Sequence, residues 1–209
     1  MQPLSRRLAP GRQVAPPDWR VAFGRRAPIE VDLGCGRGHY ALDRARHRPE
    51  IDLVALDTRA KWICRLRDQA RAEGLRNLRA IRCDARHDLR LLFGPGTVRA
   101  FTIHHPDPWW KKRHRKRRLV TSALAAELAT LLRPGGWIFV QTDVPDLAAE
   151  LEAVLGACLQ LAPLDAERLK REELAPSRSH REARCLKLGI PVRSLAFERR
   201  PDEARGPEK

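Results

Sequence analysis

The stretch "IEVDLGCGRGHYAL", residues 29–42, decides the fold. Residues 29–33 form a short segment in which apolar residues alternate with acidic ones, and they predict a strand. Residues 37–48 predict a helix. Gly34, Gly36 and Gly38 lie where the two elements meet. Glycines at such a turn let the backbone approach a ligand closely and start the next helix. The order strand, glycine turn, helix is typical of the first unit of an α/β domain.

The same alternation continues along the chain after this first unit. Further strands are expected at residues 51–57, 77–84, 98–105, 137–143 and 190–199, and helices at 61–73, 119–136 and 144–158. Strands that alternate with helices predict a mostly parallel, twisted sheet with helices on both faces. The last strand is expected at the edge, antiparallel to its neighbour. We expect one domain over residues 27–200, a flexible basic arm over 1–26 and a disordered tail over 201–209.

Acidic residues lie at the carboxyl ends of the first three expected strands. Asp32 precedes the glycines, Asp57 ends the second strand, and Asp84 with Ala85 ends the third. The carboxyl ends of parallel strands form the usual ligand crevice of open α/β sheets. There Asp57 can accept both ribose hydroxyls of an adenosine, Asp84 an adenine amino group, and Asp32 can face an amino-acid moiety. Alternatively, the G-x-G-x-G spacing is only a tight turn, and Asp57 is only a helix cap.

The charge of the chain points to its partners. Lys and Arg number 41 and Asp and Glu number 26, which gives a formal net charge of +15. Such an excess favours a nucleic-acid partner, although an Arg-rich proteome would also raise it. The segment "KKRHRKRR", residues 111–118, is called here the basic block; it carries seven Lys or Arg and no acid. It contacts phosphates or, alternatively, is a solvated face.

The sequence before the basic block is unusual as well. "HHPDPWW", residues 104–110, places one carboxylate between two prolines and directly before two tryptophans. Trp109 is expected to pack beneath the loop, and Trp110 to be the one that stacks on bases. Asp107 is otherwise a common turn residue between prolines. If the block starts the following helix, His114 and Arg117 share a face of it.

Other features bound the compartment and the chemistry. Five cysteines are widely spaced without any C-x-x-C, so no zinc site, other metal site or disulfide frame is indicated, and a cytoplasmic location is the default. Cys35, inside the glycine turn, is either a small residue or a reactive thiol. No apolar run reaches the length of a membrane span, which is about 18 residues. Arg6, Arg7 and Arg12 in the arm either wrap RNA or are simply disordered.

The acids and glycines together resemble a Rossmann-like, class I S-adenosylmethionine-dependent methyltransferase. "PDPWWKKRHRKRRLV", residues 106–120, is more specific and resembles the signature of the bacterial tRNA (guanine-N7)-methyltransferase family. "LLRPGGWIFVQTDV" (131–144), with its Thr142-Asp143, and "DWRVAFGRRAPIEVDLGCGRG" (18–38) resemble further parts of that family. The resemblance covers roughly residues 18–199.

This resemblance implies the site and the partners. S-adenosylmethionine would bind at Asp32, Gly34, Gly36, Gly38, Asp57, Asp84 and Ala85. Asp107, Asp143 and Glu182 would surround the guanine as catalytic acids. Lys111, His114, Arg117, Asp143, Ser179 and Glu182 would contact the tRNA, with the methylated guanine in the variable loop. The protein would be a monomer or a homodimer, with no membrane and no metal.

The chain departs from the family pattern at several positions. "SHRE", residues 179–182, stands where the family has Thr-x-aromatic-Glu, so that Arg181 replaces the aromatic residue. His105 stands where a Phe is usual, and Leu147 where a Tyr is common. These departures concern recognition of the base and not the cofactor. They support one alternative, a methyltransferase of this fold acting on another RNA base. A second alternative, a non-catalytic RNA-binding member, is opposed by the intact glycines and the acids at the strand ends.

Overall fold

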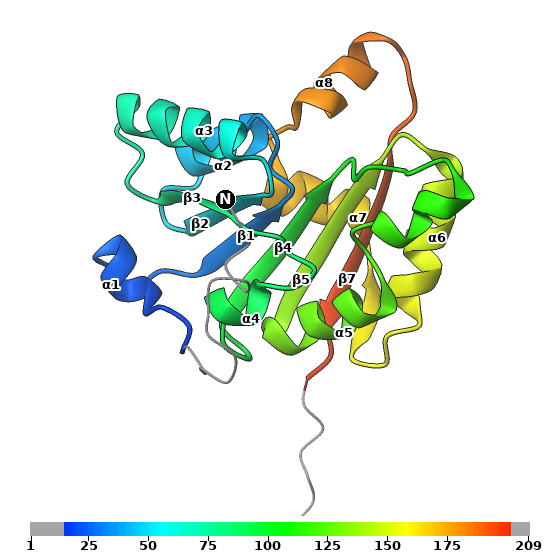
Figure 1. Ribbon diagram of the computed structural model, residues 1–209, viewed down its shortest axis with the longest axis horizontal. Helices are drawn as coiled ribbons and strands as arrows, with labels where there is room; N and C mark the ends of the chain where they lie inside the picture. The colour runs from blue at the N-terminus through cyan, green and yellow to red at the C-terminus, as the bar shows by residue number, and fades with distance from the viewer. Residues whose placement is uncertain (1–14, 202–209) are drawn as a thin grey trace, which may run out of the picture.

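The computed structural model describes residues 15–201, without the side chains of Lys112, Arg115 and Lys116. Within this range seven strands form one sheet in the order β3-β2-β1-β4-β5-β7-β6 (Figure 1). The strands are β1 (Ile29–Leu33), β2 (Asp52–Asp57), β3 (Leu78–Arg82), β4 (Val98–His104), β5 (Leu132–Thr142), β6 (Leu161–Leu164) and β7 (Arg193–Arg199). The first five run parallel, and β7 is antiparallel to β5 and β6. The expected α/β architecture with an antiparallel last strand is confirmed.

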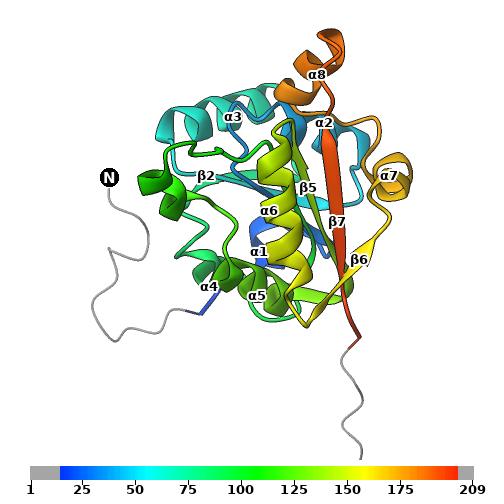
Figure 2. The same cartoon turned by 90° about the vertical axis from the view of Figure 1, so that its right-hand side faces the viewer.

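Helices cover both faces of the sheet. One face carries α1 (Trp19–Phe23), α4 (Leu89–Leu92), α5 (Ser122–Leu131) and α6 (Pro145–Gly156), and the other carries α2 (His39–His47), α3 (Ala60–Ala72), α7 (Ala166–Leu169) and the short helix η3 (Lys170–Leu174). Figure 2 shows α6 on one side of β7 and α7 on the other. The alternating side chains of the strands feed separate apolar clusters on each face.

Two expectations need correction, one about the last strand of the sheet and one about the bounds of a helix. β7 is not an edge strand, because β6 pairs with its outer side. The pattern of residues 161–164 is too short and too interrupted by Pro163 to be recognised as a strand. The helix expected at 119–136 is α5, which begins after the Thr121 cap and ends at Leu131, where β5 starts.

The expected flexible arm over residues 1–26 is wrong in its last part. Asp18 caps α1 by accepting a hydrogen bond from the Arg20 amide, and Gly24 ends the helix with a left-handed φ of 71°. Trp19 stacks on Phe93 with 5.5 Å between ring centroids and donates its indole N–H to a backbone carbonyl of α4. These contacts anchor the segment to the core. Arg6, Arg7, Arg12 and most of the expected tail lie outside the described residues.

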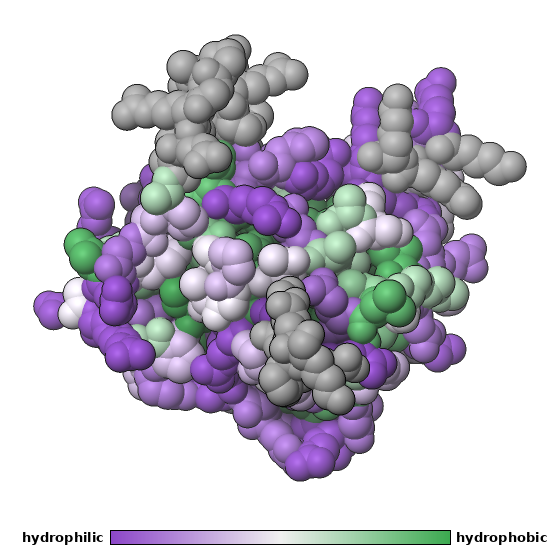
Figure 3. Space-filling view, turned by 90° about the horizontal axis from the view of Figure 1, so that it is seen from below, coloured by the Kyte–Doolittle hydropathy of each residue, from purple (hydrophilic) through white to green (hydrophobic). Residues whose placement is uncertain are grey.

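The carboxyl ends of β1 to β5 lie at one end of the molecule, beneath α8 (His180–Lys187) (Figure 1). The opposite end, seen in Figure 3, carries hydrophilic residues around its margin, as solvated surface does. Over residues 15–201 the helices lack the combination of length and hydrophobicity that a bilayer-crossing segment needs. The fold therefore brings the ends of its parallel strands together on the side where the predicted site residues occur.

Candidate active site

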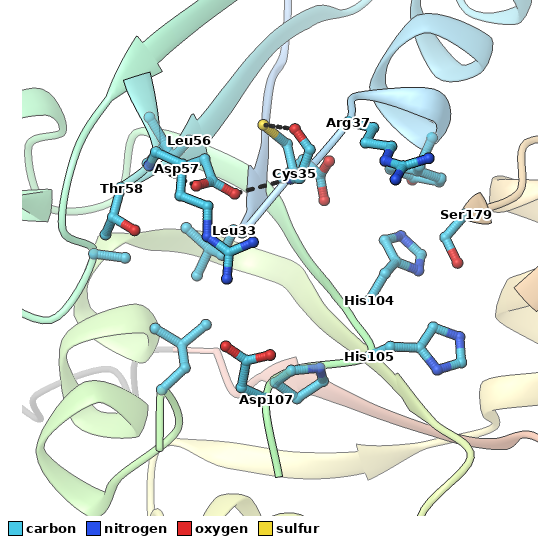
Figure 4. A pocket seen from close by; sticks show the side chains of 18 of the residues that line it. Leu33, Cys35, Arg37, Leu56, Asp57, Thr58, His104, His105, Asp107 and Ser179 are labelled. Atoms are coloured by element: carbon cyan, nitrogen blue, oxygen red, sulfur yellow. Dashed lines mark hydrogen bonds between the residues drawn. The ribbon is translucent and has the colours of Figure 1, made fainter. Parts of the chain in front are cut away.

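A cavity of about 700 Å³ lies at the carboxyl ends of the parallel strands. Figure 4 shows Asp57 and Thr58 at one end of it and His104, His105 and Ser179 at the other. Its lining includes Asp32, Gly34, Gly36, Asp57, Asp84, Ala85, His104, His105, Asp107, Trp109, Arg117, Ser179 and Arg181. The structure therefore gathers most of the predicted cofactor residues and part of the predicted base site around one space.

The glycine loop, residues 34–38, forms one wall. Gly34 and Gly36 have left-handed φ angles of 77° and 53°, which favour glycine, and they leave the cavity side of the loop open. Gly38 has a different role. It does not line the cavity, and a Cβ there would come within 2.5 Å of a Leu66 methyl group. Gly38 therefore allows α2 to pack closely against α3.

Asp57 organises the loop. One carboxylate oxygen accepts the Gly36 N–H at 2.9 Å, and the other accepts the Arg59 N–H at 2.7 Å. The N-cap of α3 is Arg59, so Asp57 is not the helix cap that the sequence also allowed. The carboxylate instead joins the ends of the first two strands, and Asp57 lines the cavity.

The third strand was expected to end at Asp84 but ends at Arg82, so Asp84 lies just after it, beside the buried Ala85. Its carboxylate is paired with Arg86, which donates from Nε at 3.0 Å and from Nη2 at 2.7 Å. This hydrogen bonding, with the charge of Arg86, lowers the pKa of Asp84. Asp84 is thus an ionised acceptor at the cavity wall.

Asp32 lies deepest of the three acids and is 2% exposed. Burial raises the pKa of its carboxyl to about 7, and the negative charge of Asp57 acts in the same direction. The Thr102 hydroxyl, at 3.2 Å, donates to it and opposes this shift. A cation placed beside Asp32 would remove the cost of its ionisation.

These features fit S-adenosylmethionine. The molecule has a cationic amino-acid end and an adenosine end, and the cavity has a buried carboxylate, an open glycine loop and two further acids along its length. Cys35 lines the same wall, but burial raises the pKa of its thiol well above the ordinary value. The thiol therefore stays protonated, and Cys35 is a small wall residue and not a nucleophile.

Asp107 lies at the mouth of the cavity and is exposed. With the described residues it makes no hydrogen bond or ion pair. The backbone near it is strained, because His105 and Trp109 have φ angles of 50° and 45°, in the region that favours glycine. Such strain at a cavity wall is typical of functional loops.

Asp143 does not line the cavity, but its carboxylate binds two residues that do. It accepts hydrogen bonds from His105 Nδ1 at 2.9 Å and from Arg181 Nη2 at 2.5 Å. Arg181 lowers the pKa of Asp143 to about 2, and His105 adds to the effect against the cost of burial. His105 and Arg181 are two of the positions where the chain departs from the family pattern. They meet on one carboxylate, which is an arrangement that sequence spacing does not reveal.

Glu182 is 2% exposed and lies behind the cavity wall. Its carboxylate pairs with Lys170 Nζ at 2.7 Å, and although burial opposes ionisation, Lys170 and Gln141 lower its pKa. Ser179 lines the cavity and also caps α8, because its hydroxyl accepts the Glu182 N–H at 3.1 Å. The capping role explains why a hydroxyl is kept at position 179.

His104 was not among the predicted site residues. Its Nδ1 lies 2.9 Å from Gln141 Oε1, its ring lines the cavity, and burial lowers its pKa to about 4. A histidine at the end of an apolar strand gives no sequence signal that separates it from a core residue. The structure shows a neutral ring on the cavity wall at neutral pH.

The basic block does not start α5, as the sequence suggested. It forms a separate 3-10 helix, η2 (Lys112–Arg117), before the Thr121 cap. His114 and Arg117 nevertheless meet, since residues three apart eclipse in a 3-10 helix. His114 contacts the Trp109 ring edge at 5.8 Å between centroids, and Arg117 lies 5.2 Å from the same ring. Lys111 is exposed beside them.

Neither tryptophan belongs to the core. Trp109, expected to pack beneath the loop, is half-buried and forms part of the cavity wall. Trp110 is 68% exposed. Both rings are therefore available at or beside the site.

Comparison with known proteins identifies the family. Residues 26–195 match the family described as "Putative methyltransferase". The tRNA (guanine-N(7)-)-methyltransferase of Myxococcus xanthus (strain DK1622) is 38% identical over 86% of this chain and 87% of its own length. That of Burkholderia cenocepacia (strain HI2424) is 36% identical over 89% of this chain and 72% of its own length.

Solved structures confirm the fold. The 16S rRNA methyltransferase KamB superposes with a TM-score of 0.59 and 19% identity, over 91% of this chain and 96% of that one. The aminoglycoside resistance methyltransferase NpmB1 superposes with a TM-score of 0.53 and 20% identity, over 90% and 94%. The chain belongs to the family of bacterial tRNA (guanine-N(7)-)-methyltransferases.

Proposed function

We propose that the protein transfers the methyl group of S-adenosylmethionine to N7 of a guanine in tRNA, in the cytoplasm. One observation carries this assignment. A single cavity joins the glycine loop and the acids at the ends of β1 to β3 to Asp107 and Arg117 at its mouth. Family membership identifies the reaction, and the cavity gives both reactants a common space.

S-adenosylmethionine supplies a methyl group on a positively charged sulfur, which is a good leaving group. In our proposal Asp32 binds the amino-acid end, and Gly34 and Gly36 allow close approach of the backbone. Asp57 accepts the ribose hydroxyls, and Asp84 accepts the adenine amino group beside Ala85. Gly38 supports this site only through helix packing.

The reaction requires no proton transfer to or from the protein. Guanine N7 has an available lone pair and no proton to lose, so no general base is required. Alignment of the reactants can supply about 7–11 kcal/mol of the barrier. Positive charge develops on the purine as the methyl group crosses, and Asp107 stabilises it electrostatically.

Asp143 and Glu182 enter the proposal as positioning residues with Ser179. Asp143 holds His105 and Arg181, both of which line the cavity. The Glu182 carboxylate pairs with Lys170 Nζ and so ties the first turn of α8 to η3, while Ser179 at the start of α8 lines the cavity. Their effect on the guanine is thus exerted through the residues that they hold.

The pH dependence of cofactor binding tests the role of Asp32. The carboxyl of Asp32 has a pKa raised to about 7, and a cationic amine binds its ionised form. We therefore expect the affinity for S-adenosylmethionine to fall as the pH drops below about 7, approaching a tenfold loss per pH unit. Calorimetric titration from pH 5.5 to 8.5 measures this, and Asp32→Asn should flatten the profile. A wild-type affinity that is independent of pH would contradict the assignment.

The basic block contacts tRNA in this proposal, with Arg117 on the cavity wall and His114 in contact with Trp109, next to the exposed Lys111. Lys111→Ala should weaken tRNA binding several-fold at low salt and reduce the salt slope of log affinity by about 1. Arg133→Ala is the matched control, since Arg133 is an exposed cation near the start of β5, away from the cavity. An equal effect of both substitutions on the salt slope would mean that only overall charge matters.

The function itself is tested by methyl transfer from labelled S-adenosylmethionine to unmodified tRNA, followed by mapping of the labelled base. Label at guanine N7 supports the proposal, and its position tests whether the variable loop is the target. Label on another base supports the second candidate, which the joint replacement at His105 and Arg181 favours. Cofactor binding without transfer to any RNA would indicate a non-catalytic RNA-binding member.

A further inference from the structure

A second cavity of about 400 Å³ adjoins the first. Its lining consists of Asp107, Pro108, Trp109, Trp110, Lys111 and His114. Asp107 and Trp109 line both cavities and form the wall between them. The volume lies within the range of small-ligand sites, which is about 300–1,000 Å³. The reaction as proposed above uses only the first cavity.

Trp109 is held firmly as the dividing wall. The Arg117 guanidinium lies over its ring at 5.2 Å, and the His114 ring meets it edge-on at an interplanar angle of 89°. Its φ of 45° is a strained conformation that persists only where the surroundings enforce it. Arg117 and His114 thus hold the Trp109 ring in a fixed position between the two cavities.

Trp110, by contrast, is not held by neighbouring rings or cations that the structure describes. It is 68% exposed and forms no ring or cation contact with the side chains that the structure describes. An exposed tryptophan beside a fixed one makes an aromatic notch, and the neighbouring Lys111 and His114 supply positive or polarisable groups at its rim. The lining is therefore mainly apolar, and Asp107, Lys111 and His114 are its polar members.

Aromatic rings surrounded by cations match one ligand class. Every nucleobase has a π-face that stacks on tryptophan, and each nucleotide carries a phosphate that attracts Lys and His. A guanine drawn into the first cavity must leave its stack, which costs a few kcal/mol and leaves its neighbours without a stacking partner. A neighbour's base that finds a new aromatic partner offsets this cost.

Building on the proposed function, we propose that the second cavity binds the base of the nucleotide next to the target guanine. Trp110 stacks on that base, and Trp109 separates it from the guanine in the first cavity. The occupant is thus single-stranded RNA that continues from the reacting nucleotide. The site accepts any base by stacking and has little sequence preference.

The experiment combines a protein variant with a change in the RNA. A tRNA transcript carries an abasic residue either directly 5′ or directly 3′ of the methylated guanine, and kcat/KM is measured with wild-type protein and with Trp110→Ala. On the intact transcript Trp110→Ala should lower kcat/KM about tenfold, a typical effect of losing one aromatic stack. One of the two abasic transcripts should lower the wild-type value to the same extent and should not lower the variant further. Leu159→Ala, which truncates a side chain that is 91% exposed in the turn between α6 and β6, is the control.

The outcomes separate this inference from the proposed function. Methylation of the intact transcript with no coupling between Trp110 and either neighbour overturns the inference alone. If wild-type protein methylates no RNA, the proposed function fails. The subsite is then tested by affinity for a guanine-centred single-stranded RNA pentamer, with and without the neighbouring bases. Equal affinity of wild type and Trp110→Ala for the complete pentamer overturns the proposed subsite.

Discussion

Asp107→Ala should reduce kcat by at least about 100-fold while leaving the affinity for S-adenosylmethionine within about twofold of wild type. Loss of a single preorganised electrostatic group has effects of this size. Asp107 is exposed and forms no hydrogen bond with the described residues, so its removal leaves the glycine loop and the Asp57 contacts intact. Steady-state kinetics with tRNA and calorimetry with the cofactor measure the two quantities separately.

Two further variants sharpen this experiment. Asp107→Asn keeps the shape and an acceptor oxygen but removes the charge, so a loss close to that of Ala would identify the charge as the active feature. Glu152→Ala removes an exposed acid from α6 and should leave both kinetics and binding unchanged. A loss of cofactor affinity in Asp107→Ala as large as the loss of kcat would place Asp107 in the cofactor site and contradict its proposed role.

The parallel part of the fold was predictable because its signals are local. The first five strands carry apolar residues at alternate or successive positions, and glycine or proline marks several of the boundaries between elements. α1 and β6 were missed for different reasons. α1 spans only five residues, although Asp18 and Gly24 are the cap residues that could have revealed it. β6 depends on pairing with β7 and has no clear pattern of its own.

The cavity wall was predictable where a residue lies at or just after the end of a parallel strand. Asp32, Asp57 and Asp84 lie at the cavity as expected. Contacts between distant segments were not predictable, because they depend on how α8 lies over β4 and β5. The meeting of His105 and Arg181 on Asp143 is such a contact.

A buried ion network beneath the site should dominate the stability of the domain. Glu30 of β1, 1% exposed, receives two hydrogen bonds of 2.9 Å from the fully buried Arg44 of α2 and also pairs with Arg99 of β4. Arg99 continues to Glu173 at 2.7 Å. Glu173 belongs to η3, whose Lys170 holds Glu182 of α8. The network therefore connects the sheet to the helix that covers the site.

Glu30→Leu should lower the free energy of unfolding by about 3–5 kcal/mol, because it leaves the Arg44 guanidinium buried without its carboxylate. Since domains are stable by only about 5–15 kcal/mol in total, urea denaturation should show a large fall in the midpoint. Adding Arg44→Met should restore part of the loss, because it removes the unpaired charge while keeping an apolar side chain.

Asp43→Ala is the matched control for this network, since it breaks the exposed pair between Asp43 and Arg46 on the same helix. Exposed pairs are worth about 0–1 kcal/mol, because water screens both charges. A loss in Glu30→Leu as small as in Asp43→Ala would mean that Arg44 finds water or another acceptor when Glu30 is absent. The link from β1 through η3 to α8 would then be too weak to hold Glu182 in place, and the positioning role proposed for Glu182 would lose its structural support.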